Sequence, residues 1–258
     1  MNRELIVEDI RKKILCYLQV IQDEYPVSME RIMKIKTDLN SKIHFSHGTI
    51  TFFVRDNELY LPEDAFAVID EFSKLEEYGS TNNTGVRVED YLKTDATYMD
   101  YIKHVITDGL DVLSFYEESL LHEVMHMCGG SGGALLDEGF NELKTRELAQ
   151  KYGIKIAAVG YQKEVEVAKR FEDILGTDVC SKLTFLPLEE RNDYLYSIGG
   201  SDLVGFYNQV RNTMEKEGKE YSRNVSEVRN PFVKAKLYEK VFYKNTWDVI
   251  ERYMNPKL

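Results

Sequence analysis

Two histidines and a glutamate stand together at His122, Glu123 and His126 in a mostly apolar stretch of the chain. If this stretch is helical, His122 and His126 lie one turn apart and both imidazoles can point at one metal ion. Glu123 is turned about 100° around the helix from His122, so it is poorly placed as a ligand but can reach a water molecule on the metal. The pattern predicts a site for metal-assisted hydrolysis.

The flanking residues favour a buried helix. Uncharged side chains surround the two histidines, Ser114 and Glu117 have the spacing of a capping box, and a glycine pair follows the segment. We therefore expect a helix from about Phe115 to Cys128. The alternative is an accidental match, in which both histidines are core residues and Glu123 is solvated.

A second helix is expected over residues 134–148, after a link that is mostly glycine. So short a link favours a helical hairpin, which would bring the first turns of this helix near His126. Glu138 lies in those turns, and Glu142 follows one turn later on the same face. Gly139 is costly inside a helix, and a close approach of the two helices would explain its presence.

Together, these two segments resemble the gluzincins, which are the thermolysin-like and aminopeptidase-like zinc metallopeptidases. The resemblance lies in the His-Glu-x-x-His motif of residues 122–126 and in Asp-Glu-Gly-Phe-Asn-Glu at residues 137–142. It covers only about residues 115–148. The gap between the second histidine and the downstream glutamate is shorter than in those two branches, and Asp137 replaces their usual asparagine. No subfamily is therefore assigned.

The resemblance implies that His122, His126 and Glu138 bind Zn2+, which usually keeps one further position open for water. It also implies that Glu142 orients a ligating histidine, a role that suits a carboxylate. Each glutamate has an alternative. Glu138 could be an acid favoured by the helix dipole, and Glu142 could pair with Arg146 on a solvated face.

The implied reaction is hydrolysis of a bond in a peptide or protein substrate. Zinc lowers the pKa of its bound water to about 7, and Glu123 would take that proton and return one to the leaving amine. Relatives usually add a tyrosine or histidine that steadies the oxyanion. No histidine follows His126, so we choose Tyr161, which comes after the second helix and a loop. With 17 tyrosines in the chain, ordinary packing is the alternative.

Two other functions fit the same residues. The first is a zinc hydrolase that acts on a substrate other than a peptide, such as an amidase or deacylase. The second is a catalytically silent interaction protein that zinc merely stabilises. An intact Glu123 favours catalysis over this second alternative.

The composition is that of a globular protein, with 43% hydrophobic and 12% aromatic residues. A net charge of -11 argues against nucleic acid or an anionic membrane as the main partner. The chain has no apolar run long enough for a membrane span, and its first residues do not resemble a secretory signal. We expect a cytoplasmic protein. The oligomeric state is open.

The three cysteines, Cys16, Cys128 and Cys180, are far apart and suggest neither a disulfide framework nor a structural zinc knuckle. Cys128 lies about 200° around the helix from His126, so we expect it to pack in the core. His44 and His47 would point to opposite faces of an extended chain, and we do not expect them to bind metal.

Hydrophobic periodicity predicts a mainly helical α+β fold. Strands are expected at 49–54 and 58–61, joined as a hairpin through Arg55, Asp56 and Asn57, and a short one at 86–88, after a loop at 79–85. Further helices are expected at 3–24, 28–40, 62–78, 91–113, 161–175, 188–196, 201–216 and 231–254, with a break at Asp108 and Gly109 in the fourth of them.

The resemblance implies a single zincin-like domain over residues 1–258. Residues 1–130 would form an N-terminal lobe with a small sheet, ending in the motif helix. Residues 131–258 would form a helical C-terminal lobe that carries the third ligand.

Overall fold

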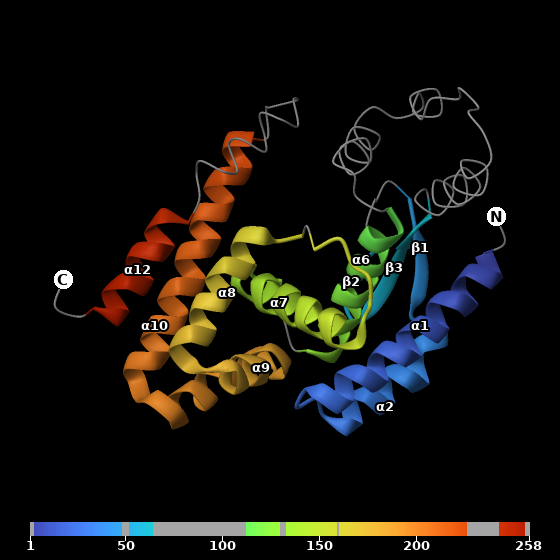
Figure 1. Ribbon diagram of the computed structural model, residues 1–258, viewed down its shortest axis with the longest axis horizontal. Helices are drawn as coiled ribbons and strands as arrows, with labels where there is room; N and C mark the ends of the chain where they lie inside the picture. The colour runs from blue at the N-terminus through green and yellow to red at the C-terminus, as the bar shows by residue number, and fades with distance from the viewer. Residues whose placement is uncertain are drawn as a thin grey trace. The chain divides into compact units, whose positions relative to one another are not determined.

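The computed structural model describes residues 3–47, 52–63, 112–129, 133–158, 160–225 and 243–255. Over these residues the protein is mainly helical, with one small mixed sheet (Figure 1), which confirms the expected α+β class. The chain divides into two compact units, of residues 1–23, 28–127 and 148–158, and of residues 24–27, 128–147 and 159–258. The zincin-like architecture and its two lobes stay predictions.

The first unit combines the sheet with two N-terminal helices and most of the motif helix. Its elements are α1 (Arg3–Glu24), α2 (Met29–Asp38), the 3-10 turn η1 (Leu39–Ser41), β1 (Ile43–Ser46), β2 (Phe53–Arg55), β3 (Glu58–Pro62), α6 (Val112–Cys128) and the end of α7 (Leu135–Tyr152).

The apolar stripes predicted for α1 and α2 supply much of this unit's core. Leu5, near the start of α1, is 67% exposed and does not belong to this core. Ser28 accepts a hydrogen bond from the backbone N–H of Arg31 and caps α2. The buried residues of the two stripes are Ile10, Ile14, Leu18, Ile21, Ile32, Ile35 and Leu39.

The sheet has the strand order β1-β3-β2. Strands β2 and β3 form the predicted antiparallel hairpin, but Arg55 belongs to β2 and only Asp56 and Asn57 make the turn. Both turn residues have left-handed backbone angles, φ 55° and 62°, as a two-residue turn of the type I′ class requires. β1, which pairs with β3 in parallel, was not predicted, although Ile43 and Phe45 alternate with polar residues; all four of its residues are half-buried.

The second unit is helical where the structure describes it. Its elements are the first part of α7 (Leu135–Tyr152), α8 (Gln162–Leu175), α9 (Thr177–Phe185), α10 (Leu188–Val225) and α12 (Lys244–Met254). Phe171 lies within this unit's apolar core, where it contacts the rings of Phe140 and Phe206.

The two helices predicted at 188–196 and 201–216 are the two parts of α10, separated by a kink at Gly200 (φ 66°). The helix predicted at 231–254 is wrong at Tyr243, whose left-handed backbone precedes the start of α12. Glu217 of α10 accepts hydrogen bonds from the backbone N–H groups of Asn245 and Thr246, at 2.9 and 3.1 Å, and so caps α12. The short helix α9 was missed.

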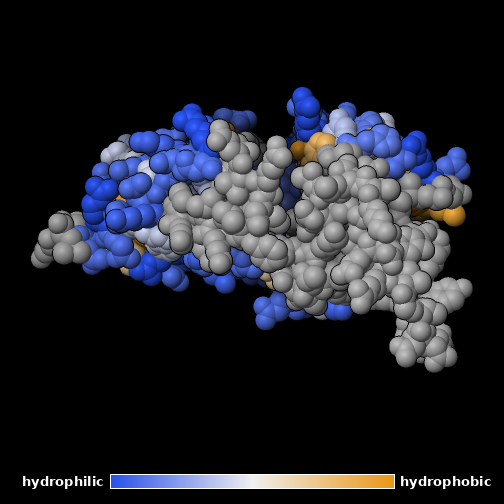
Figure 2. Space-filling view, turned by 90° about the horizontal axis from the view of Figure 1, so that it is seen from above, coloured by the Kyte–Doolittle hydropathy of each residue, from blue (hydrophilic) through white to orange (hydrophobic). Residues whose placement is uncertain are grey.

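Several predicted elements lie outside the described residues, namely the loop at 79–85, the strand at 86–88, nearly all of the helices at 62–78 and 91–113, the first half of the helix at 231–254 and the start of the strand at 49–54. Pro62 ends β3 and does not begin a helix. No helix in the described ranges is long and apolar enough to cross a bilayer. The described residues on the face in Figure 2 are mostly hydrophilic, with small apolar patches.

Candidate metal centre

The predicted motif helix is present as α6, but it begins at Val112. Ser114 is therefore buried inside the helix, and the capping-box prediction is wrong. Glu117 instead accepts hydrogen bonds from the side chains of Lys13, at 2.5 Å, and of Tyr17. These bonds join α6 to α1.

The C-terminal end of α6 is held by Arg31 of α2. The Arg31 Nε donates to the backbone oxygen of Met127 at 2.8 Å, and its Nη2 donates to the side-chain oxygen of Asn57 at 2.9 Å. A cation is favourable at the negative end of a helix. Arg31 therefore connects the end of α6 to the turn of the β2-β3 hairpin.

His122 and His126 face each other on α6, as the motif predicted. Their Nε2 atoms are 3.0 Å apart, and the ring planes meet at 73°. Two nitrogens bound to one tetrahedral zinc at about 2.0–2.1 Å would be about 3.3 Å apart, so the pair has nearly the spacing that a shared zinc ion requires. The neighbouring apolar residues, and Cys128 as expected, are buried.

Glu123 has a partner that the sequence did not reveal. Its Oε2 accepts a hydrogen bond from the backbone N–H of Val54, in strand β2, at 2.8 Å. The carboxylate is thereby attached to the sheet, which contradicts the alternative of a fully solvated Glu123.

Glu138, the third predicted ligand, completes the group. The donor atoms of His122, His126 and Glu138 all lie within 4.8 Å of one another. No other group of three potential metal ligands was found in the part of the chain that the structure describes. Two imidazole nitrogens and one carboxylate oxygen are a known ligand set of catalytic zinc, so the side chains fit that ion. Binding itself stays a prediction.

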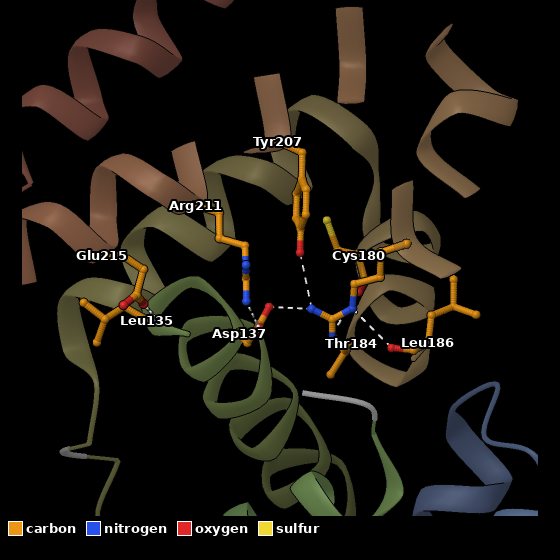
Figure 3. A network of polar contacts seen from close by, with 9 residues as sticks. Leu135, Asp137, Cys180, Thr184, Leu186, Tyr207, Arg211 and Glu215 are labelled. Carbon is orange, nitrogen blue, oxygen red and sulfur yellow. Dashed lines mark hydrogen bonds and ion pairs between the residues drawn. The ribbon is translucent and has the colours of Figure 1, made fainter. Parts of the chain in front are cut away.

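Asp137, beside Glu138, holds the first turn of α7 to α10 within the second unit (Figure 3). Its carboxylate accepts hydrogen bonds from Arg191 Nη1 at 2.5 Å and from Arg211 Nη2 at 3.4 Å. Arg191 Nη1 also donates to the hydroxyl oxygen of Tyr207 at 3.3 Å. Asp137 and Arg191 are almost fully buried. An acid at this position, where the resembling family has asparagine, thus neutralises a buried arginine.

Burial and neighbouring charges shift the pKa values of Arg191 and Tyr207 in this network. Burial disfavours the charged form of Arg191, but Asp137 and Tyr207 outweigh it, so the pKa of Arg191 is raised. The pKa of Tyr207 is also raised, by burial first and then by Asp137. Close by, Glu215 Oε1 accepts a hydrogen bond from the N–H of Leu135 at 2.6 Å and so caps α7.

Gly139 is explained by a close helix contact, but the partner helix differs from the one expected. A Cβ atom at residue 139 would overlap the backbone carbonyl of Glu164, in α8. The contact that explains this glycine is therefore with α8, and not with the motif helix as expected. Glu164 is itself buried and accepts a hydrogen bond from Tyr243 Oη at 2.5 Å.

Glu142 has the partner proposed as its alternative. Its Oε1 accepts a hydrogen bond from Arg146 Nε at 2.7 Å. The pair is not on a solvated face, because Glu142 is only 1% exposed. Arg146 also donates to the backbone oxygen of Gly160 and to the side chain of Gln162. A role for Glu142 in orienting a histidine stays a prediction.

Tyr161 precedes α8 with a left-handed backbone (φ 46°) and is 40% exposed. Left-handed angles cost energy in a residue other than glycine and often occur at functional sites. The exposure argues against ordinary core packing, and the oxyanion role stays a prediction.

The other histidines and the cysteines considered as ligands do not form a further group of potential metal ligands in the described residues. His44 lies 3.1 Å from Glu58, and His47 lies 3.2 Å from Glu63, so the two histidines have different carboxylate neighbours. Cys16, Cys128 and Cys180 are free thiols.

Comparisons of the chain with protein-family models, with curated proteins and with solved structures gave no match. The gluzincin resemblance therefore rests on the motif and on the residues that follow it.

Proposed function

We propose that this protein is a zinc-dependent metallopeptidase of the gluzincin type. The observation that carries the proposal is the grouping of donor atoms from His122, His126 and Glu138 within 4.8 Å, with Glu123 directly after the first ligand. A zinc ion held by these side chains would supply a Lewis acid and an acidified water molecule.

The chain's own residues would do the remaining work. His122 and His126 would bind the zinc ion through unprotonated Nε2 atoms, and the Glu138 carboxylate would supply the third ligand. Glu123 would accept a proton from the attacking water on a carboxylate oxygen and pass it to the nitrogen of the leaving amine. Glu142 would orient a histidine, and the Tyr161 hydroxyl would donate to the oxygen that gains charge.

The test is Glu123→Gln, assayed with a peptide library beside zinc stoichiometry. The amide oxygen of glutamine can still accept the Val54 N–H, so the fold and the bound zinc should be retained while hydrolysis falls by at least about a thousandfold. Glu166→Gln, on an exposed surface of α8, is the matched control and should keep parental activity. A Glu123→Gln variant with parental turnover would refute the assignment of the general base.

A second function is favoured by one observation. Because the Glu123 carboxylate is already bound to the backbone of β2, it has a structural reason to be present without any catalysis. On this reading, zinc would stabilise a protein without hydrolytic activity. Zinc binding that raises the melting temperature, with no hydrolysis by the parent chain, would favour this function over the peptidase.

A further inference from the structure

Strand β2 offers one backbone N–H group on the side of the hairpin that faces away from β3. Val54 is opposite Leu59 in the antiparallel register. The N–H of Leu59 donates outward, to the backbone oxygen of Lys42, at 2.8 Å. In an antiparallel pair both residues point their N–H groups either toward each other or away from each other. The Val54 N–H therefore points away from β3.

The carboxylate of Glu123, in α6, accepts a hydrogen bond from this outward N–H group. Its Oε2 lies 2.8 Å from the Val54 nitrogen. A glutamate side chain has three rotatable bonds, and a bond to the backbone of a strand removes much of that freedom. Because the two-residue turn at Asp56 and Asn57 fixes the hairpin register, the donor has a defined place.

The strand and the helix are also joined at a second point. Arg31 connects Asn57, in the hairpin turn, to the backbone oxygen of Met127 near the end of α6. The two connections lie on either side of His126 along the helix, at residues 123 and 127. A hairpin held at two points cannot turn about a single bond, so the Val54 N–H keeps its direction toward α6.

We propose that the backbone N–H of Val54 is the positioning group for the general base, Glu123. By holding one carboxylate oxygen, it fixes the location from which this side chain exchanges protons. This inference rests on the proposed function, which supplies the role of Glu123, whereas the hydrogen bond is a feature of the first unit alone.

Val54→Pro tests the positioning role, because proline lacks the N–H but leaves the ladder bonds of the hairpin in place. With peptide substrate we expect kcat to fall on the order of tenfold to a hundredfold, with KM and zinc stoichiometry unchanged. Val54→Ala, which keeps the N–H and shortens the side chain, should lose less than about threefold. Equal kcat losses in the two variants would overturn the proposal.

Amide hydrogen exchange tests the bond without any activity. The Val54 amide should exchange slowly in the parent and in Glu123→Gln, whose side chain still accepts, and at least about tenfold faster in Glu123→Ala. The neighbouring amide of Leu59, bound to Lys42, should be unaffected and so controls for unfolding of the hairpin. Equal Val54 exchange in all three proteins would overturn the inference.

The two readouts separate the inference from the proposed function. If the parent hydrolyses no peptide but the Val54 amide responds to Glu123→Ala, the peptidase fails and the hydrogen bond remains. If Glu123→Gln abolishes hydrolysis and Val54→Pro leaves kcat unchanged, the peptidase stands and the positioning role is refuted.

Discussion

Helices α6 and α7 carry the candidate ligands, and each is fixed by different means. In the first unit, Glu123 of α6 is held by a backbone N–H from β2. In the second unit, Asp137 of α7 is held by the side chains of Arg191 and Arg211, which are 54 and 74 residues away. α6 therefore depends on the shape of a hairpin, whereas the start of α7 depends on buried charge.

This difference should make the two units respond differently to substitution. Removing one member of a buried ion pair leaves the other charged and desolvated, which is far costlier than losing a partly exposed contact. The second unit should thus be the more sensitive to single charge changes.

The largest expected effect comes from Asp137→Ala, which leaves Arg191 buried without a carboxylate. We expect the free energy of unfolding to fall by about 3–5 kcal/mol, measured by urea denaturation. Asp137→Asn, which keeps a hydrogen-bond acceptor, should lose less. A loss below about 1 kcal/mol for Asp137→Ala would show that charge is not what fixes α7.

Gly139→Ala tests the close contact of α7 with α8. The added methyl group would overlap the backbone carbonyl of Glu164, so we expect a loss of about 2–3 kcal/mol in urea denaturation. Gly205→Ala, in an open stretch of α10, is the matched control and should stabilise by about 0.5–1 kcal/mol. Similar values for the two variants would contradict the contact.

Arg31→Ala probes the first unit. It removes a partly buried charge from the end of α6 and from the hairpin turn, and we expect a loss of about 1–2 kcal/mol in thermal unfolding. Arg55→Ala, whose side chain is 77% exposed, should change the unfolding free energy by less than about 0.5 kcal/mol. Equal losses of unfolding free energy in the two variants would show that the bonds of Arg31 do not stabilise the end of α6.

The smallest effect concerns alkaline pH. Burial raises the pKa of Cys180 to about 12, so the thiol ionises in the unfolded chain first. A raised folded pKa means that the native state holds more protons above pH 9, and stability should fall as pH rises from about 9 toward 12, by about 1 kcal/mol at pH 10. Cys180→Ala should flatten this slope and Cys16→Ala, at an exposed position, should not. A parental slope in Cys180→Ala would contradict the assignment.

Local patterns in the sequence predicted most of the described elements, with β1 and α9 as exceptions, but few of the contacts between elements. The isoleucine stripes, the hairpin and the motif helix follow periods of two or about 3.6 residues, which neighbouring residues alone display. The placement of both histidines on one face of a helix was predictable because their spacing is also a local pattern. The proximity of Glu138 followed from the glycine link and from the family resemblance.

What the sequence could not predict depends on distant contacts. Val54 contributes a backbone N–H, which every residue but proline possesses, so nothing marks it in the sequence. Ser114 and Glu117 have capping-box spacing, yet Glu117 binds residues of α1 that are about a hundred positions away. The sequence also offered no reason for an aspartate at residue 137, where the gluzincins have asparagine, because its ion-pair partner Arg191 is 54 residues away.

The most direct test of the metal centre is zinc titration of the metal-free chain. The parent should bind about one zinc ion per chain, and His126→Ala and Glu138→Ala should each weaken binding by about a hundredfold or more. His47→Ala, in a different and exposed environment, should bind zinc like the parent. Unchanged zinc affinity in both His126→Ala and Glu138→Ala would contradict the account.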